Sequence, residues 1–193
     1  MLVEQREMQK KAALSGLLFG VILLCIGIPA LYVIAQASSM AVVIGSPVLL
    51  SFIVPILLAV FFCISLRKQV GGYWSFREAT GGIFVLFITA YLLYSAGSHV
   101  HTHYIDKKIA QEVKENVLNV TTTFASKQNI PAEELDEKID EMKENMEEEK
   151  NPSTGKLIQS VLFSIIILFI GALLFAAIFK KEEPLFNEPT SNP

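Results

Sequence analysis

Three long stretches of the sequence contain no charged side chain. The first runs between Lys11 and Arg67, and the others cover residues 79–105 and 157–179. The hydrocarbon core of a bilayer is about 30 Å thick and is crossed by about 20 apolar residues in a helix. The first stretch is long enough for two crossings and each of the others for one. The pattern therefore predicts an all-α fold, a four-helix transmembrane bundle that forms a single membrane domain over residues 1–193.

The polar cluster Gln36-Ala37-Ser38-Ser39-Met40 divides the first stretch. The predicted spans are residues 12–35, 44–66, 80–103 and 157–179. The amino terminus also has the pattern of a cleaved signal peptide, with basic residues, an apolar run and the small-residue sequence Ala35-Gln36-Ala37. We favour a retained helix, because the apolar run is longer than the about 7–15 residues of a signal peptide core.

The positions of lysine and arginine predict the orientation. Basic residues precede the first span and fill the connection after the second, whereas the connection between them has none. Since cytoplasmic loops carry the excess of basic residues, both termini are expected in the cytoplasm. Lys180 and Lys181 after the last span agree with this orientation. Lys107 and Lys108 oppose it, but the early helices usually determine topology.

Residues 105–152 form the only sizeable segment outside the predicted membrane. Between Asp106 and Lys156 there are thirteen acidic and eight basic residues. Apolar residues recur at helical spacing in two stripes, which predicts two amphipathic helices joined by a turn at Gln128-Asn129-Ile130-Pro131. The stripes are Ile105, Ile109, Val113, Val117 and Val120, and then Leu135, Ile139, Met142 and Met146. We expect an extracytoplasmic helical hairpin that packs on itself and caps the bundle; the alternatives are a partner-binding or an interfacial role.

Small residues and prolines mark places where helices approach or bend. Gly16 and Gly20 form a GxxxG pattern, which allows close approach of another helix, and Ala172 and Ala176 offer a similar face. Packing within the chain, a homodimer face and no special role are the three interpretations. Prolines in the first two spans are expected to kink those helices, because proline has no backbone N–H. They are Pro29, Pro47 and Pro55.

Composition limits the possible functions. Hydrophobic residues make up 52% of the chain, and the net charge of −3 with no basic patch gives no indication of nucleic-acid binding. Cys25 and Cys63 each lie inside a span, so neither a disulfide framework nor a CxxC motif is expected. No Asp, Glu, Lys or Arg lies in the middle of a span, which argues against a proton-coupled carrier. No cofactor is expected.

All the histidines of the protein lie at the outer end of the third span, as His99, His101 and His103. On a helix, His99 and His103 share a face while His101 points away. Metal binding and pH sensing through imidazole protonation are possible roles. The third interpretation is that they are ordinary interfacial histidines, and because a metal site usually needs three or four ligands we favour it.

The connection between the second and third spans contains a distinctive turn. It includes Gly71-Gly72-Tyr73, Ser75-Phe76 and Glu78-Ala79. Its aromatic residues Tyr73, Trp74 and Phe76 suit the headgroup layer, and Ser75 with Glu78 has the form of a capping box that begins the third span. A structural role explains most of these residues, and partner contact or ligand binding is the alternative.

This turn, with four spans and an acidic segment before the last one, resembles the bacterial family known as domain of unknown function 4199. Trp74, Arg77 and Thr80 depart from the residues typical of that family, which are aliphatic, glycine and phenylalanine. The resemblance implies a multi-pass protein of the bacterial cytoplasmic membrane, and it implies no reaction and no catalytic residue.

The sequence favours a non-enzymatic accessory protein of the membrane that binds a membrane-protein partner or assembles as a homo-oligomer. The alternative is a small transporter or channel for a metal ion or small solute, with His99, His101 and His103 at its outer mouth. An enzyme ranks third, because Glu78, Tyr91 and the histidines are expected on opposite sides of the membrane.

Overall fold

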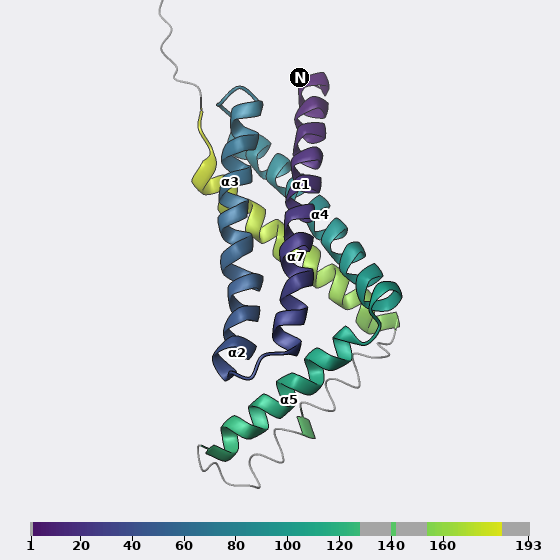
Figure 1. Ribbon diagram of the computed structural model, residues 1–193. Helices are drawn as coiled ribbons and strands as arrows, with labels where there is room; N and C mark the ends of the chain where they lie inside the picture. The colour runs from purple at the N-terminus through teal and green to yellow at the C-terminus, as the bar shows by residue number, and fades with distance from the viewer. Residues whose placement is uncertain (1, 128–139, 142–153, 183–193) are drawn as a thin grey trace, which may run out of the picture.

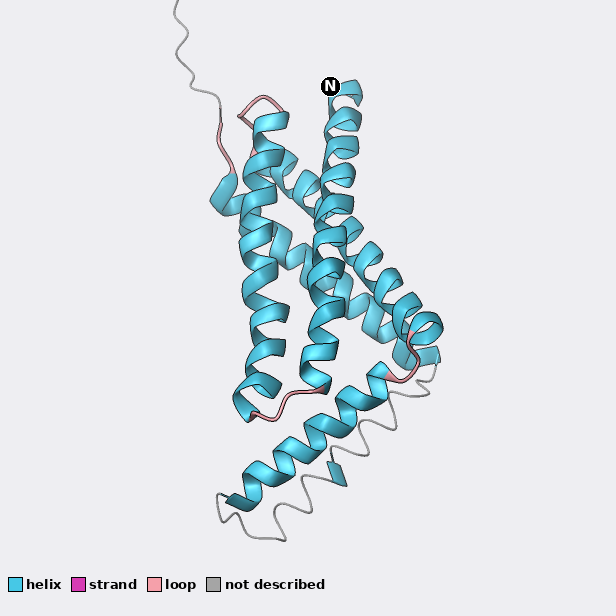
Figure 2. Cartoon of the chain, viewed as in Figure 1, coloured by secondary structure: helices cyan, strands magenta, loops and turns pink. Residues whose placement is uncertain are grey.

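The fold is a bundle of long apolar helices with one amphipathic helix across its end (Figures 1 and 2). The computed structural model describes residues 2–127, 140–141 and 154–182, and within these residues no strand is present. The predicted all-α class is confirmed. The elements are α1 (Leu2–Ala35), α2 (Met40–Val48), η1 (Leu49–Ile53), α3 (Val54–Gln69), α4 (Phe76–Val100), η2 (His101–Ile105), α5 (Ile109–Lys127) and α7 (Thr154–Phe179).

Four helical stretches are long and apolar enough to cross a membrane. They are Gln5–Ala35, Met40–Gln69, Phe76–Ile105 and Ile158–Phe179. Three of them extend beyond the spans expected from the apolar runs alone. Helical hydrogen bonds continue past the last apolar residue into charged ends, such as Arg67 and Lys68 in the final turn of α3.

The four long helices run up and down, so that the start of α1 and the carboxyl end of α7 lie at the same end of the bundle (Figure 1). The most extensive contact joins α1 and α4, followed by the contact between α4 and α7. The α2–η1–α3 segment touches α1 and α7 over shorter regions. One helix pair therefore forms the centre of the fold, and the other two helices are added to it.

Gly16 and Gly20 lie in the contact between α1 and α4. A Cβ added at Gly16 would stand 2.5 Å from the carbonyl oxygen of Leu86, and one at Gly20 would stand 2.9 Å from the carbonyl oxygen of Ala90. Both distances are shorter than carbon and oxygen atoms tolerate. The GxxxG glycines therefore lie in an intramolecular contact, where they let the two backbones approach closely.

The second membrane crossing is interrupted by a π-helical turn. This turn, η1, lies between Pro47 and Pro55, and the N–H of Val54 bonds to the carbonyl of Leu49 five residues earlier. Proline cannot donate to the preceding turn, so a widened turn beside it is a common way to keep the helix continuous. The predicted bend of this span takes the form of that turn.

The closely packed core lies in the half of the bundle where α1 begins and α7 ends. Its fully buried side chains include Cys63, Leu66, Ile83 and Leu86. By contrast, Cys25, in the outer half of α1, is exposed. The helices are thus joined tightly at one end and less tightly towards the other.

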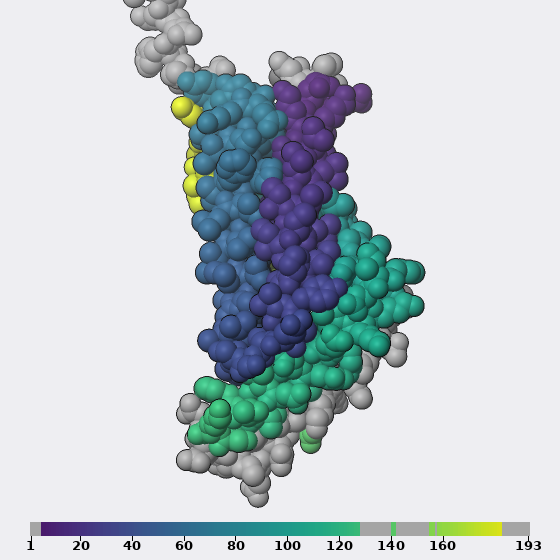
Figure 3. All heavy atoms as spheres, in the orientation of Figure 1, coloured from purple at the N-terminus to yellow at the C-terminus, as the bar shows by residue number. Residues whose placement is uncertain are grey.

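Helix α5 lies across the outer ends of α1 and α2, as Figure 3 shows. The side-chain amide of Asn116 donates hydrogen bonds to the carbonyl oxygens of Ile34 (2.7 Å) and Ala37 (2.8 Å), at the last turn of α1. Ile109 and Val120 of the predicted apolar stripe are buried on the same side. The stripe therefore faces the bundle. The second predicted arm lies outside the described residues except for Asp140 and Glu141, so the hairpin stays a prediction.

Candidate intramembrane binding site

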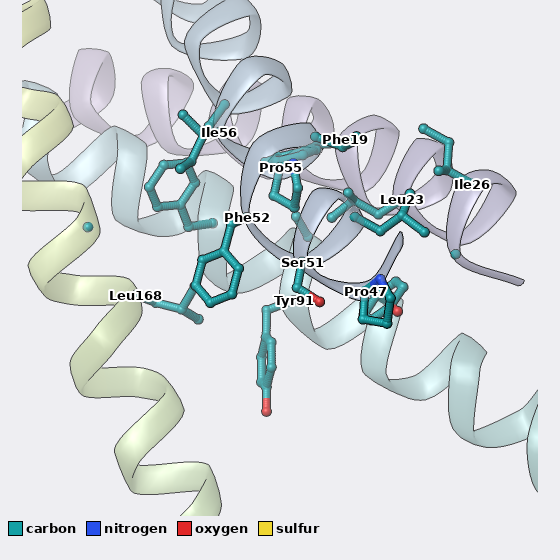
Figure 4. A pocket seen from close by; sticks show the side chains of 18 of the residues that line it. Phe19, Leu23, Ile26, Pro47, Ser51, Phe52, Pro55, Ile56, Tyr91 and Leu168 are labelled. Carbon is teal, nitrogen blue, oxygen red and sulfur yellow. The ribbon is translucent and has the colours of Figure 1, made fainter. Parts of the chain in front are cut away.

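A pocket of about 620 Å³ opens between the outer and middle parts of the four long helices (Figure 4). Its walls come from the outer half of α1, the segment around η1, the middle of α4 and the middle of α7. The lining residues that Figure 4 labels are Phe19, Leu23, Ile26, Pro47, Ser51, Phe52, Pro55, Ile56, Tyr91 and Leu168. The pocket lies where the packed core ends.

The pocket wall is almost entirely apolar. Phe52 and Leu168 point toward one another across the gap between η1 and α7 (Figure 4). Phe52 is 63% exposed and Ile56 is 51% exposed, so both stand at the rim and the pocket is reached from outside the bundle. A pocket entered from the side of a membrane helix bundle is accessible to molecules dissolved in the bilayer.

Polar atoms enter the pocket from α4. The Tyr91 hydroxyl donates a hydrogen bond to Ser164 Oγ of α7 (3.1 Å), and the Ser164 hydroxyl donates to the carbonyl oxygen of Ser160 (2.9 Å). Tyr94 also lines the pocket, where its ring lies about 3.0 Å from the position that a Cβ on Gly27 would take. The tyrosines thus form the polar edge of an otherwise apolar wall.

A second, shallower hollow of about 350 Å³ begins at the same two tyrosines. Its lining residues come from α4 and the start of η2, which continues it: Tyr91, Tyr94, Ser95, Ser98, His99 and Thr102. Their spacing of three or four residues puts them on one face of the helix. We name this surface the polar stripe of α4. It leads from the pocket to the outer end of the helix.

Of the three histidines, only His99 lines this stripe, and the three side chains do not come together at one point. The rings of His99 and His103 stack with centroids 3.9 Å apart, and both side chains are exposed. His101 is buried on another side of the helix. Within the described residues no group of three His, Cys, Asp or Glu side chains is placed to hold a metal ion. Metal binding and the transporter hypothesis built on it therefore stay predictions.

His101 belongs to a polar cluster under α5. Tyr32 donates a hydrogen bond to Asp106 Oδ2 (3.0 Å), and its hydroxyl oxygen lies 3.3 Å from His101 Nε2. Asp106 Oδ1 accepts hydrogen bonds from the backbone N–H groups of Lys108 and Ile109, which caps the start of α5. The hydrogen bond from Tyr32 is the main reason that the pKa of Asp106 lies below its ordinary value. The cluster joins α1, α4 and α5.

The glycine-rich turn between α3 and α4 lies at the end of the bundle opposite to the histidines, where it contacts the carboxyl end of α7. Gly71 (φ +104°) and Gly72 (φ +86°) adopt backbone conformations that favour glycine. Ser75 and Glu78 form the predicted capping box at the start of α4. Tyr73 is 38% exposed and Phe76 is 40% exposed, whereas Trp74 is only 3% exposed. The expectation that Trp74 faces the headgroup layer with its neighbours is therefore wrong.

Trp74 is buried because it contacts the end of α7. Its indole N–H donates to the carbonyl oxygen of Phe179, and its backbone exchanges two hydrogen bonds with Lys181. Arg67 also donates to the carbonyl of Phe179 (3.4 Å). These contacts satisfy carbonyl groups that a helix end leaves unpaired. They give the turn a structural role.

Sequence reasoning missed the pocket altogether. Its residues come from four helices, and each taken alone is an ordinary apolar residue of a membrane span. The one available signal was the polarity of the third span, since Tyr91, Tyr94, Ser95 and Ser98 fall at helical spacing. That pattern marks one polar face but does not show which helix covers it.

Comparison with known proteins gives a family and no function. No curated protein and no solved structure matches the chain. The family model described as "Protein of unknown function (DUF4199)" matches residues 14–181, which include α1 from Leu14 onward, the other three long helices and the glycine-rich turn. This match confirms the resemblance that the turn and the four spans indicated, and the chain belongs to the DUF4199 family.

Proposed function

We propose that this protein is a non-enzymatic accessory protein of the bacterial cytoplasmic membrane, which binds an apolar partner group in its intramembrane pocket. The observation that carries the proposal is the pocket itself. Its volume of about 620 Å³ lies inside the range of about 300–1,000 Å³ that is typical of ligand sites. Its apolar walls match a group that is already dissolved in the bilayer.

The chemistry of the wall favours binding over catalysis. The polar side chains that line the pocket in the described residues are the hydroxyl-bearing Ser51, Tyr91 and Tyr94. A hydroxyl becomes a strong nucleophile or acid only beside a base, a metal or another activating group. Tyr91 instead donates to another hydroxyl, that of Ser164. Such groups orient a bound molecule by hydrogen bonding.

A pair of phenylalanines provides the test. Phe52 stands at the pocket rim, and Phe61 lies on α3 outside the pocket; the two are similarly exposed, at 63% and 65%. We would replace each in turn by the photoreactive residue p-benzoylphenylalanine and irradiate cells that make the full chain. A discrete adduct from position 52 that is absent from position 61 supports the proposal. Identical adduct patterns at both positions contradict it.

The proposal includes an orientation with both termini in the cytoplasm. The basic residues in the first turns of α1 and in the last turn of α3 lie at the same end of the bundle as the carboxyl end of α7 (Figure 1). The variants Gln9→Cys and Ser126→Cys, in a chain without Cys25 and Cys63, test this arrangement. A membrane-impermeant maleimide is expected to label position 126 in spheroplasts and position 9 only after permeabilisation. The reverse order of labelling would overturn the orientation.

A further inference from the structure

The polar stripe of α4 needs hydrogen-bonding partners that the described chain does not supply. The hydroxyls of Tyr94, Ser95 and Ser98 make no hydrogen bond within the described residues. Thr102 is satisfied, because it donates to the carbonyl oxygen of Ser98 in its own helix. In the hydrocarbon and interfacial layers of a bilayer, unpaired polar groups are unfavourable. The stripe is therefore complementary to a polar group that comes from outside the chain.

The stripe and the pocket share two lining residues. Tyr91 and Tyr94 line both hollows, so the apolar space ends where the row of hydroxyls begins. From Tyr91 to Thr102 the helix rises about 16 Å. The polar part lies toward the outer end of α4, and the apolar part lies toward the middle of the membrane. This order of polarity is that of a lipid in the outer leaflet.

The charge of the lining residues restricts the polar group. No Asp, Glu, Lys or Arg is among the described residues that line either hollow. A charged head group would therefore lose water without gaining an ion pair, which is unfavourable in a medium of low dielectric constant. Serine and tyrosine hydroxyls both donate and accept, and they suit an uncharged group with hydroxyls of its own.

We propose that the pocket and the polar stripe of α4 together bind one amphiphile, with its hydrocarbon chain in the pocket and an uncharged, hydroxyl-bearing head group along Ser95 and Ser98. This inference rests on the proposed function, which it makes specific by naming the occupant as a lipid. A transmembrane helix of a partner protein is the other occupant, and the test distinguishes it from a lipid.

The test uses the purified full-length chain in vesicles of phosphatidylethanolamine and phosphatidylglycerol. The probe is a monoacylglycerol with a photoreactive diazirine in its chain, compared with the fatty acid of the same chain. The double variant Ser95→Ala/Ser98→Ala removes two hydroxyls and leaves the pocket intact. We expect its monoacylglycerol labelling to fall about tenfold, the effect of losing two hydrogen bonds with a net value of about 0.5–1.5 kcal/mol each.

The matched control is Ser46→Ala/Thr80→Ala. Both of its hydroxyls donate to a carbonyl oxygen four residues earlier in their own helix, and neither lines the hollows. Labelling of this variant is expected to equal that of the unaltered chain. Fatty-acid labelling is expected to be weaker than monoacylglycerol labelling. Equal labelling by the two probes, or equal losses in the two double variants, would overturn the assignment of the head group.

A separate variant distinguishes this inference from the proposed function. Ser51→Phe places a ring in the pocket and does not touch the polar stripe. If this ring reduces labelling while the Ser95→Ala/Ser98→Ala variant does not, the pocket binds an apolar group and the head-group assignment is wrong. If the ring has no effect on labelling, the proposed function fails as well. A polypeptide adduct from p-benzoylphenylalanine at position 52 would show that the occupant of the pocket is a protein partner and not a lipid.

Discussion

The indole nitrogen of Trp74 lies 2.8 Å from the carbonyl oxygen of Phe179, to which its N–H donates a hydrogen bond. The two residues are 105 positions apart in the chain. The contact joins the turn between the second and third crossings to the last turn of the fourth. Because α7 otherwise packs mainly on α4, this contact fixes its carboxyl end.

We predict that Trp74→Phe destabilises the protein by about 1–3 kcal/mol, because the Phe179 carbonyl keeps only the longer hydrogen bond from Arg67 and part of the buried ring volume is removed. Unfolding followed in detergent measures the change. Tyr73→Phe is the control, since it keeps the aromatic ring over which Lys181 Nζ lies at 5.1 Å. If both variants have the same unfolding midpoint as the unaltered chain, the contact between Trp74 and Phe179 does not stabilise the position of α7.

Gly16→Ala is predicted to destabilise the contact between α1 and α4 by about 1–3 kcal/mol, the usual effect of overpacking. The new Cβ would stand 2.5 Å from a backbone oxygen of Leu86, which has little room to move. Gly81→Ala is the matched control in α4, because nothing lies within 4 Å of its Cβ position. There the better helix propensity of alanine is expected to leave stability unchanged or to raise it by up to about 1 kcal/mol. Thermal unfolding of both variants in the same detergent compares them, and equal losses would contradict the packing role of Gly16.

The fold followed from the sequence where the signals were local. Length and charge-free runs gave the four spans, and the spacing of Ser75 and Glu78 gave the capping box. Contacts between segments far apart in the sequence could not be predicted in this way. From its neighbours in the sequence, Trp74 resembles an interfacial aromatic residue, and only the fold shows that it contacts Phe179. An apolar residue such as Leu168 has the same sequence pattern whether it faces lipid or a pocket.

Asn116→Leu is predicted to loosen α5 from the bundle. The amide donates to two carbonyl oxygens at the end of α1, and leucine keeps a similar size but cannot donate. We expect α5 to become accessible, with hydrogen exchange of residues 109–127 at least about fivefold faster, as the loss of about 1 kcal/mol implies. Asn119→Leu is the control, because Asn119 is exposed on α5. Unchanged exchange in Asn116→Leu would show that apolar packing alone holds the helix.

The cluster of Tyr32, His101 and Asp106 predicts a defined dependence of stability on pH. The pKa of Asp106 is lowered chiefly by the hydrogen bond from Tyr32, with smaller contributions from backbone N–H groups and from His101. A carboxyl group whose pKa is lower in the folded state stabilises the fold above its unfolded pKa, and this stabilisation is lost as the pH falls through the folded value.

The variant Tyr32→Phe removes the main cause of the lowered pKa, so the pKa of Asp106 moves back toward its ordinary value. The variant is therefore less stable than the unaltered chain at neutral pH. The difference shrinks as the pH falls from about 4, the ordinary value for an aspartate, through the lower pKa that Asp106 has in the folded, unaltered chain. Thermal unfolding between pH 3 and pH 7 measures this difference, with Tyr104→Phe, whose ring is 74% exposed, as the control. A difference between Tyr32→Phe and the unaltered chain that stays constant over the whole range would show that Tyr32 stabilises the fold by packing and not through the charge of Asp106.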